Sequence, residues 1–376
     1  MKIVNDTMGV ILTRDSESEL GGLTSERAEA AVPFAGRYRI IDFILSSVVN
    51  SGIHNVGVVT NYNYQSLLDH LGSGKEWDLG RKLSGLFILP PHVRRGAIRV
   101  SSGNIEELYR VMYYLHRSKE KYVLLSEKNV ICNMTFDDAM DFHMAKEADI
   151  TLIYNNLEER RRSELTRITT VEVDSNSQVT NLEVQPRFAR SNNASMGIYI
   201  THKILLENLI EECISNGLTD FEFDLLKRNI GNLRIFGYQY DGFVMRLDSV
   251  RSYFRNSLAL TDKSTMDKLF SQENLIYTKV KDEVPTRYGE NAKISNCLIA
   301  DGCNIDGEVS NSILFRGVNI SKRVKITNSI IMQGSEIHEN STLENVILDK
   351  DVIVRVGKRL TGQPDFPVVI SKGGVV

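Results

Sequence analysis

The loop after the first predicted strand carries the side chains that would meet a bound phosphate. Ligands of α/β sheets bind at the carboxyl ends of strands, so the segment after Leu12 is the first place to search. Glycine amides approach phosphate closely, whereas each carboxylate repels it by about 1–4 kcal/mol at about 4 Å. This loop contains no glycine, and its charged residues are Arg14, Asp15, Glu17 and Glu19. It therefore disfavours a bound triphosphate.

Other residue types that build catalytic or metal sites are scattered along the chain. The histidines lack the spacing of zinc ligands, so we expect no metal site. No CxxC pair occurs among the four cysteines, which are Cys132, Cys213, Cys297 and Cys303. This cysteine usage, without a signal peptide before the first strand, favours a reducing cytoplasm.

Composition excludes two further classes of partner. Hydrophobic residues make up 42% of the chain and charged residues 25%, with a formal net charge of -3. These values are typical of a globular protein without the basic field that attracts nucleic acid. No apolar run approaches the roughly 20 residues that span a bilayer. We therefore expect a cytoplasmic protein that binds neither nucleic acid nor a membrane.

An α/β domain is predicted from the N-terminus to residue 250. Short β-branched runs alternate there with amphipathic helical patterns, which is typical of a mostly parallel sheet. The clearest predicted strands are Gly9–Leu12, Val56–Thr60, Tyr122–Leu125, Ile150–Tyr154 and Met196–Ile200. The predicted helices are Asn63–Leu71, Ile105–Arg117, Phe136–Glu147 and Lys203–Ile214.

The pattern changes to a repeat in the last quarter of the chain. Asn296, Asn311, Asn328 and Asn345 follow one another at intervals of 15, 17 and 17 residues, and aliphatic residues come after each. Intervals close to three hexapeptides predict a parallel β-helix, whose coils stack their inward aliphatic side chains. We expect this domain at residues 286–376, joined to the first by a helical segment at residues 251–285. Its flat faces and edge coils suit subunit contacts.

Four segments resemble, in the same order, those of bacterial ADP-glucose pyrophosphorylases, also called glucose-1-phosphate adenylyltransferases. They are Arg27–Phe43, Asn50–Ile53, Ala194–Tyr199 and the helix from Ser252 to Leu260. The resemblance covers nearly the whole chain. It implies a Rossmann-like α/β nucleotidyltransferase domain followed by a left-handed parallel β-helix. Enzymes of this family join ATP and glucose 1-phosphate into ADP-glucose, release pyrophosphate and use Mg²⁺.

The motifs that carry this reaction depart from the family pattern. The glycines and arginine of the phosphate loop are lost across Arg14–Glu19. The two family aspartates that hold magnesium align with Lys128 and Arg246, and the lysine that grips the sugar phosphate aligns with Gln185. A shift of one residue would bring Glu127 or Asp248 near the metal positions. We expect no catalytic residue and no cofactor in this chain, with Mg²⁺ serving only a catalytic partner.

Weaker binding positions also follow from the resemblance. Ser195 matches a family serine near the sugar, and Asn61 lies where the family often has a glutamine near the base. Packing in a strand and a polar strand end are the alternative interpretations. A regulatory site for sugar phosphates or other anions is implied at Arg27, Arg37 and Arg39. Alternatively, these arginines pair with Glu26, Glu29 and Asp42.

Low-GC Gram-positive bacteria encode a degenerate second subunit beside the active pyrophosphorylase, and this chain resembles that subunit. We expect a non-catalytic regulatory subunit that joins the catalytic paralogue in a heterotetramer during glycogen biosynthesis. The alternative is a weakly active glucose-1-phosphate adenylyltransferase. A hexapeptide acyltransferase is the third interpretation, but its histidine would have to be His338, which has no second histidine nearby.

Overall fold

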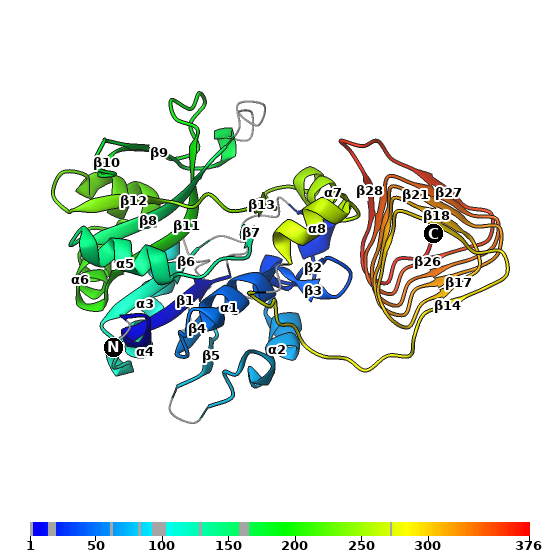
Figure 1. Ribbon diagram of the computed structural model, residues 1–376, viewed down its shortest axis with the longest axis horizontal. Helices are drawn as coiled ribbons and strands as arrows, with labels where there is room; N and C mark the ends of the chain where they lie inside the picture. Colours follow the sequence, from blue (N-terminus) through cyan, green and yellow to red (C-terminus); the bar gives the residue numbers. More distant parts are fainter. Residues whose placement is uncertain are drawn as a thin grey trace.

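The computed structural model describes residues 3–13, 20–60, 63–81, 84–91, 103–127, 130–157, 165–270 and 273–376. Two domains lie side by side, with α7 (Val250–Ala259) and α8 (Lys263–Leu269) between the N-terminal sheet and the β-helix (Figure 1). An extended segment after α8 leads into the β-helix. Within these residues no helix is long and apolar enough to cross a membrane.

The N-terminal domain is built on a nine-stranded mixed sheet. Its main path runs β10-β9-β11-β6-β1-β4-β5, and β8 pairs with both β11 and β12. The pairs of β1 with β4 and β6, of β4 with β5 and of β8 with β12 are parallel. The strands are β1 (Thr7–Leu12), β4 (Val56–Val59), β5 (Leu86–Leu89), β6 (Tyr122–Ser126), β8 (Ile150–Asn156), β9 (Thr170–Val173), β10 (Val179–Glu183), β11 (Asn193–His202) and β12 (Ile235–Gln239).

Alternating side chains of these strands enter two separate cores, one on each face of the sheet. On β1, Met8 and Val10 pack with α3, α4 and α6, whereas Ile11 packs with α1, α2 and α5. This alternation follows from the two-residue period of a strand. The helices are α1 (Ile40–Asn50), α2 (Gln65–Leu71), α3 (Asn104–Arg110), α4 (Met112–Arg117), α5 (Asp137–Ala145) and α6 (Lys203–Ser215).

One predicted helix differs from the structure. The segment Ile105–Arg117 forms two helices, α3 and α4, which meet at Val111. The Val111 backbone has φ −104° and ψ 13°, outside the helical region, and this bend lets both Leu108 and Leu115 remain buried. Two small sheets complete the domain: β2 (Pro33–Phe34) with β3 (Tyr38–Arg39), and β7 (Val130–Cys132) with β13 (Val244–Arg246).

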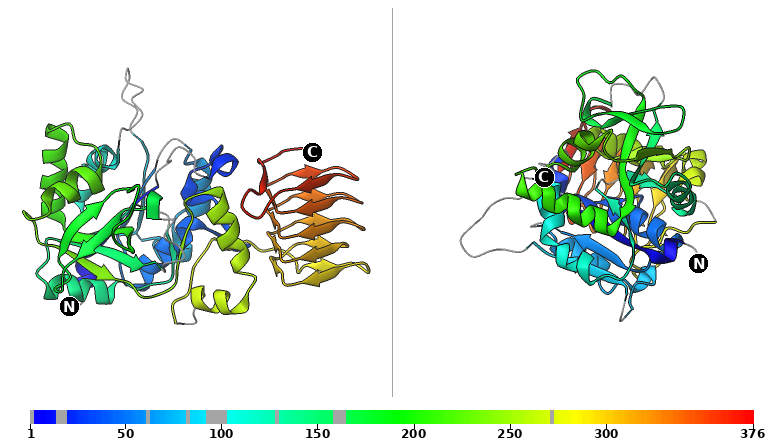
Figure 2. Two further views of the ribbon diagram at one scale, coloured as in Figure 1. Left: turned by 90° about the horizontal axis from the view of Figure 1, so that it is seen from above. Right: turned by 90° about the vertical axis from the view of Figure 1, so that its left-hand side faces the viewer.

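The C-terminal domain is a β-helix of five stacked coils, as the repeat predicted (Figure 2). Three parallel sheets of five strands form its sides. The first holds β14 (Arg287–Tyr288), β17 (Asn304–Ile305), β20 (Asn319–Ile320), β23 (Glu336–Ile337) and β26 (Ile353–Val354). The second holds β15 (Lys293–Ser295), β18 (Glu308–Ser310), β21 (Lys325–Thr327), β24 (Thr342–Glu344) and β27 (Arg359–Thr361). The third holds β16 (Leu298–Ile299), β19 (Ile313–Leu314), β22 (Ile330–Ile331), β25 (Val346–Leu348) and β28 (Val368–Ile370).

The repeated asparagines mark the same corner in four of the five coils. Asn296, Asn311, Asn328 and Asn345 have left-handed backbones, with φ of 51°, 47°, 46° and 52°. Asparagine tolerates this conformation better than most residues because its short polar side chain can hydrogen-bond locally. The repeated asparagines in the sequence therefore reflect a left-handed backbone conformation that recurs at the same corner of successive coils.

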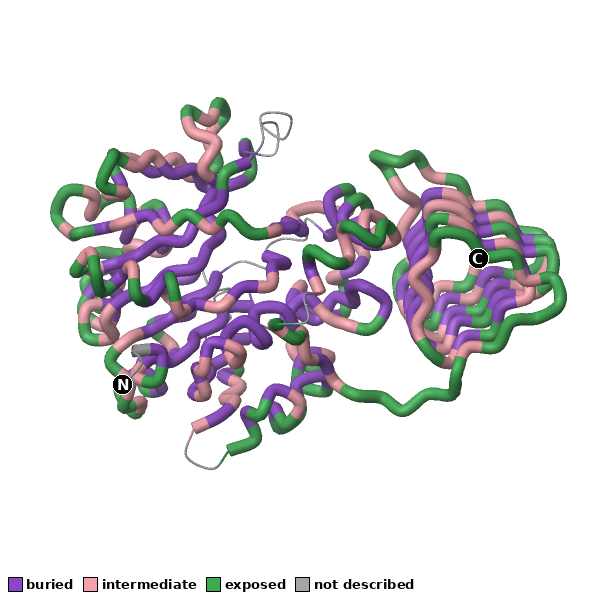
Figure 3. Tube along the Cα trace, viewed as in Figure 1, coloured by how far each residue is buried: buried purple, intermediate pink, exposed green. Residues whose placement is uncertain are grey.

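A shared hydrophobic core joins the two domains. Phe34, Tyr253 and Phe254 of the first domain pack in one cluster with Ile330 and Met332 of the β-helix. The third sheet of the β-helix faces this cluster, and its central strands β19, β22 and β25 are fully buried (Figure 3). Burial of this apolar surface fixes the β-helix against the first domain.

Candidate functional site

A cavity of about 440 Å³ lies where the first domain, the connecting segment and the β-helix meet. Its lining is strongly cationic, because all three parts contribute basic side chains, and the acids in the lining are fewer. The cations are Arg37 and Arg39 from the first domain, Lys279 and Lys281 from the connecting segment, and Arg316, Lys350 and Lys372 from the β-helix. The acids are Glu26, Asp69 and Asp351. This arrangement suits a ligand with several negative charges.

Arg39 is held at the cavity by the start of α1. Its backbone N–H donates to Asp42 Oδ2 at 2.9 Å, a capping contact at the helix N-terminus. Its Nη1 donates to the Ser66 carbonyl at 2.5 Å and to the Ser66 hydroxyl at 2.9 Å. Burial, partly offset by nearby Asp42, lowers the pKa of Arg39 to about 10. Arg39 is therefore a partly buried cation at the wall of the cavity.

For two β-helix cations in the lining, burial and neighbouring positive charges disfavour the charged form. Burial, together with the smaller effects of the Arg39 and Arg27 charges, lowers the pKa of Lys350 to about 7. Burial also lowers the pKa of Arg316, with a smaller contribution from Arg37. The Arg316 Nε is buried and has no hydrogen-bond partner among the described residues. A bound anion would relieve both the mutual repulsion and this unsatisfied donor.

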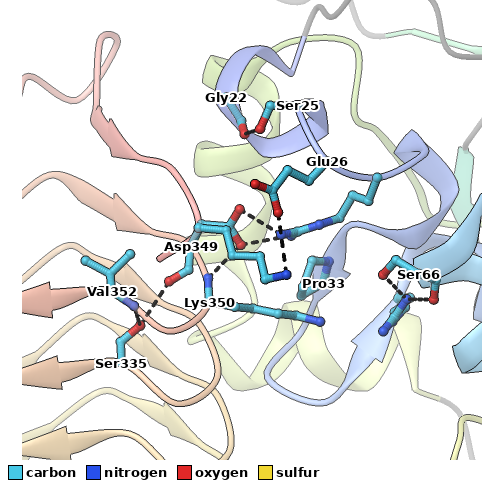
Figure 4. Close-up of polar contacts among 12 residues, drawn as sticks. Gly22, Ser25, Glu26, Pro33, Ser66, Ser335, Asp349, Lys350 and Val352 are labelled. Atoms are coloured by element: carbon cyan, nitrogen blue, oxygen red, sulfur yellow. Dashed lines mark hydrogen bonds and ion pairs between the residues drawn. The ribbon is translucent and has the colours of Figure 1, made fainter. Parts of the chain in front are cut away.

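Arg27 lies beside the cavity but is committed to another contact. Its Nη1 and Nη2 donate to Asp349 Oδ1 and Oδ2, each at 2.8 Å, and both side chains are buried (Figure 4). Asp349 lies in a β-helix turn. Its backbone carbonyl accepts a hydrogen bond from Ser335 Oγ at 2.9 Å. This bidentate ion pair joins the first domain to the β-helix.

Ser195 and Arg246 meet in a second polar region at the end of the central sheet. Arg246 ends β13 and is buried. Its Nη1 donates to the Ser195 carbonyl at 2.8 Å, and its Nη2 donates to Asn155 Oδ1 at 2.5 Å and to the Ala194 carbonyl at 3.2 Å. A fixed cation therefore lies at the carboxyl ends of β8 and β13, beside the start of β11.

Comparison with known proteins identifies the family of this two-domain chain. A family model described as nucleotidyl transferase matches residues 8–233, and one described as GlmU-like, C-terminal hexapeptide matches residues 282–365. The glycogen biosynthesis protein GlgD of Bacillus subtilis (strain 168) is 35% identical over 375 residues, which are 98% of this chain and 96% of that protein. The glucose-1-phosphate adenylyltransferases of Bacillus cytotoxicus and Bacillus anthracis are each 31% identical over 371 residues, 97% of this chain and 98% of theirs. The chain belongs to the glucose-1-phosphate adenylyltransferase family.

The residues that are described do not fit the magnesium ion that this family's reaction uses. Arg246, which the resemblance described above aligns with a metal aspartate, is a buried cation bonded to three oxygen atoms. The neighbouring acid Asp248 is half-buried and accepts from Ser249 Oγ at 3.4 Å. Among the described residues, no group of three or more His, Cys, Asp or Glu side chains is arranged to hold a metal. Arginine at this point opposes Mg²⁺ instead of coordinating it.

Several predicted positions of the adenylyltransferase pattern lie outside the described residues: Arg14, Asp15, Glu17, Glu19, Asn61 and Lys128. Of the others, Gln185 lies in the loop after β10 with a left-handed backbone, φ 45°. Ser195 is buried in β11, and its hydroxyl accepts from Gly197 N at 3.1 Å. His338 is exposed on the β-helix, 3.9 Å from Glu336. Arg37 and Arg39 line the interdomain cavity, whereas Arg27 pairs with Asp349.

Sequence reasoning missed most of the cavity. Five of its cations come from the connecting segment and from β-helix turns, where no local motif singles them out: Lys279, Lys281, Arg316, Lys350 and Lys372. It also missed the partner of Arg27, which lies 322 residues further along the chain. Only the packing of the β-helix against the first domain brings these groups together.

Proposed function

We propose that this chain is a non-catalytic regulatory subunit of a cytoplasmic glucose-1-phosphate adenylyltransferase that serves glycogen biosynthesis. The buried Arg246 guanidinium is the observation that carries the proposal, because it places a fixed cation at a position that catalysis requires for a metal carboxylate. The similarity to the Bacillus subtilis protein named for glycogen biosynthesis supports the pathway. The catalytic paralogue supplies the Mg²⁺ chemistry in this proposal.

The cationic interdomain cavity supports the regulatory part of the proposal. It is lined by both domains, so an anion held there contacts both at once. A sugar phosphate or another multiply charged anion would then stabilise one interdomain arrangement over others. An effector acts through such a difference in affinity between two states.

The first coil of the β-helix supports assembly with a paralogue. Its strands β14, β15 and β16 have a paired neighbour on one side only. Tyr288 and Ile294 are 56% and 37% exposed at this end. Edge strands with exposed apolar side chains are natural pairing surfaces, and a coil of the same cross-section would cover them. We propose that the β-helix of the catalytic subunit does so within a heterotetramer.

The direct test measures ADP-glucose formation with Mg²⁺ by this chain, by an intact paralogue and by their mixture. We expect no activity from this chain alone and a change in the rate, substrate affinity or effector response of the paralogue on mixing. If mixing changes none of these, the regulatory proposal fails. Replacing Ile294 with aspartate should abolish copurification with the paralogue, whereas the same change at Ile204, exposed on α6 in the other domain, should not.

A weakly active adenylyltransferase is the second candidate. It is favoured by Glu127, a buried carboxylate directly after β6, and by Asp248 directly after β13. Asn104 Nδ2 donates to Glu127 Oε1 at 2.8 Å, so this carboxylate is already engaged. Activity in the isolated chain that is lost in both Glu127→Gln and Asp248→Asn variants would establish this alternative.

A further inference from the structure

Three hydroxyl groups converge on one buried carboxylate, that of Glu222. Thr169 Oγ1 donates to Oε2 at 2.5 Å, Tyr199 OH donates to Oε1 at 2.7 Å, and Ser195 Oγ donates to Oε1 at 3.2 Å. Glu222 itself is 6% exposed. Hydroxyl groups gathered around a small pocket are the donors that recognise sugar hydroxyls or phosphate oxygens, and here a side chain of the protein receives them.

Ser195 has no hydroxyl proton left for a ligand. A serine hydroxyl donates one proton, and this one is directed to Glu222. The same oxygen accepts from Gly197 N at 3.1 Å, across a bulge in the pairing of β11 with β8. The backbone carbonyl of Ser195 is bound by Arg246. The position that resembles a sugar contact is therefore engaged by Glu222, Gly197 and Arg246.

The carboxylate is held in place by its own short helical turn, Phe221–Leu226. Asn104 Oδ1 accepts from Phe221 N at 2.8 Å, and Asp220 Oδ1 accepts from Phe223 N at 2.7 Å. Gly103 lies so close to this turn that a Cβ there would come 2.1 Å from the Thr219 carbonyl oxygen. The backbone of the turn is thus fixed against the N-terminus of α3, so the Cα of Glu222 has a defined place beside the three hydroxyl groups.

The charge of Glu222 opposes a sugar phosphate as well. Burial raises the pKa of Tyr199 well above its ordinary value, and the Glu222 carboxylate adds to this shift. The phenol therefore remains a donor to the carboxylate across neutral pH. A phosphate entering this region would meet a like charge in a medium that screens it poorly.

We infer that the Glu222 side chain occupies the sugar subsite and thereby prevents glucose 1-phosphate from binding to this chain. The inference deepens the proposed non-catalytic role and rests on it. In the proposed function, replacement of the metal carboxylates prevents turnover, whereas Glu222 prevents glucose 1-phosphate from binding. The pocket is closed by an internal carboxylate that takes the hydrogen bonds a sugar would need.

The test titrates glucose 1-phosphate into the full-length chain and follows binding by calorimetry or by ligand-observed NMR. We expect no binding by the unaltered chain at millimolar ligand, and binding by Glu222→Ala with a dissociation constant of about 1 mM or less. Glu222→Gln, which removes the charge and keeps the volume, should bind less well than Glu222→Ala. The double variant Glu222→Ala with Ser195→Ala should lose the gain. Glu212→Ala, on the exposed face of α6, is the matched control and should not bind.

Circular dichroism and thermal unfolding first establish that each variant is folded. Glu222→Ser replaces Glu222→Ala if the alanine variant does not fold. Binding by the unaltered chain as tight as by the variant would overturn the inference, as would a folded alanine or serine variant that still binds no glucose 1-phosphate. Neither result depends on ADP-glucose formation, so failure here is distinct from failure of the proposed function, which the activity assay measures.

Discussion

At the scale of single residues, the buried guanidinium of Arg246 has a structural role. Arg246 does not point into solvent but binds the carbonyls of Ala194 and Ser195 and the side chain of Asn155. Such a group stabilises the fold only as long as all its acceptors are paired, because unpaired buried polar atoms are costly. Arg246 is thereby part of the buried core.

Arg246→Met should destabilise the protein by about 2–4 kcal/mol in free energy of unfolding, because it leaves three buried oxygen atoms without their donor. Chemical denaturation measures the change. Arg251→Met is the matched control, since Arg251 pairs with Asp365 at the surface and should contribute within about 1 kcal/mol. Equal losses in the two variants would contradict a structural role for Arg246.

The lowered pKa of Lys350 predicts that the affinity of the interdomain cavity for anions depends on pH. Its pKa of about 7 in the folded protein means that it gains its charge as the pH falls through neutrality. A bound anion favours the charged form, so affinity should fall several-fold from about pH 6 to about pH 8. Titration with sulfate, whose own charge is constant in this range, measures the effect.

The control for this experiment replaces one lysine at a time. Lys350→Met should bind sulfate more weakly and with a flatter pH profile, whereas Lys358→Met, at an exposed turn of the β-helix, should behave as the unaltered chain. A pH profile that is the same with and without Lys350 would refute its involvement. The low pKa also implies that Lys350 costs stability when both states are protonated, and that stability rises with pH between the folded and unfolded pKa values.

At the scale of elements, each β-helix coil depends on a left-handed corner. Asn328 has φ of 46°, and no hydrogen bond of its side chain is found among the described contacts. Its contribution should then come mainly from backbone conformation. The neighbouring residues Ile330 and Ile331 are fully buried on opposite faces of β22, since Ile330 packs in the interdomain cluster and Ile331 packs inside the β-helix, so the corner also sets which side chain enters each core.

Asn328→Ala should lower the free energy of unfolding by about 1 kcal/mol, because alanine adopts the left-handed region at greater cost. Asn328→Gly should remain within a few tenths of a kcal/mol of the unaltered chain, since glycine reaches this region freely. Urea denaturation compares the three proteins. If the glycine variant lost as much as the alanine variant, the asparagine side chain would be acting through contacts and not through the backbone.

At the scale of the whole molecule, one ion pair and one core connect the domains. Arg27 and Asp349 form a bidentate pair that is 3% and 1% exposed, beside the cluster of Phe34, Tyr253 and Ile330. A buried pair of this kind destabilises strongly when one partner is removed, because the other charge remains buried. The pair also borders the cationic cavity, so the same contact positions the residues that would bind an effector.

Asp349→Ala should cost about 3–5 kcal/mol of stability, and the double variant Arg27→Met with Asp349→Leu should recover part of that loss. Thermal unfolding measures stability. Limited proteolysis of the connecting segment at residues 273–285 reports separation of the domains, and cleavage should be faster in the single variant. Additive losses in the double variant would show that the two side chains do not act as a pair.

The sequence by itself determined the features that depend on local geometry. The spacing of Asn296, Asn311, Asn328 and Asn345 predicted the coils because each asparagine satisfies a backbone requirement at its own position. The alternation of β-branched runs with amphipathic helical patterns predicted the α/β domain for the same reason. That Arg246 stands where the family has a metal ligand is implied by the resemblance, and the structure shows that this cation is buried.

Only the tertiary structure shows which residues from distant parts of the chain come into contact. The cavity draws on Arg39, Lys281 and Lys350, which lie far apart along the chain and meet only because the β-helix packs on the first domain. Nothing in the local sequence marks Glu222 as the partner of Ser195, since the contact depends on how Phe221–Leu226 docks on α3 and β11. Backbone propensity acts over a few residues, whereas burial and charge act between whichever groups the fold brings together.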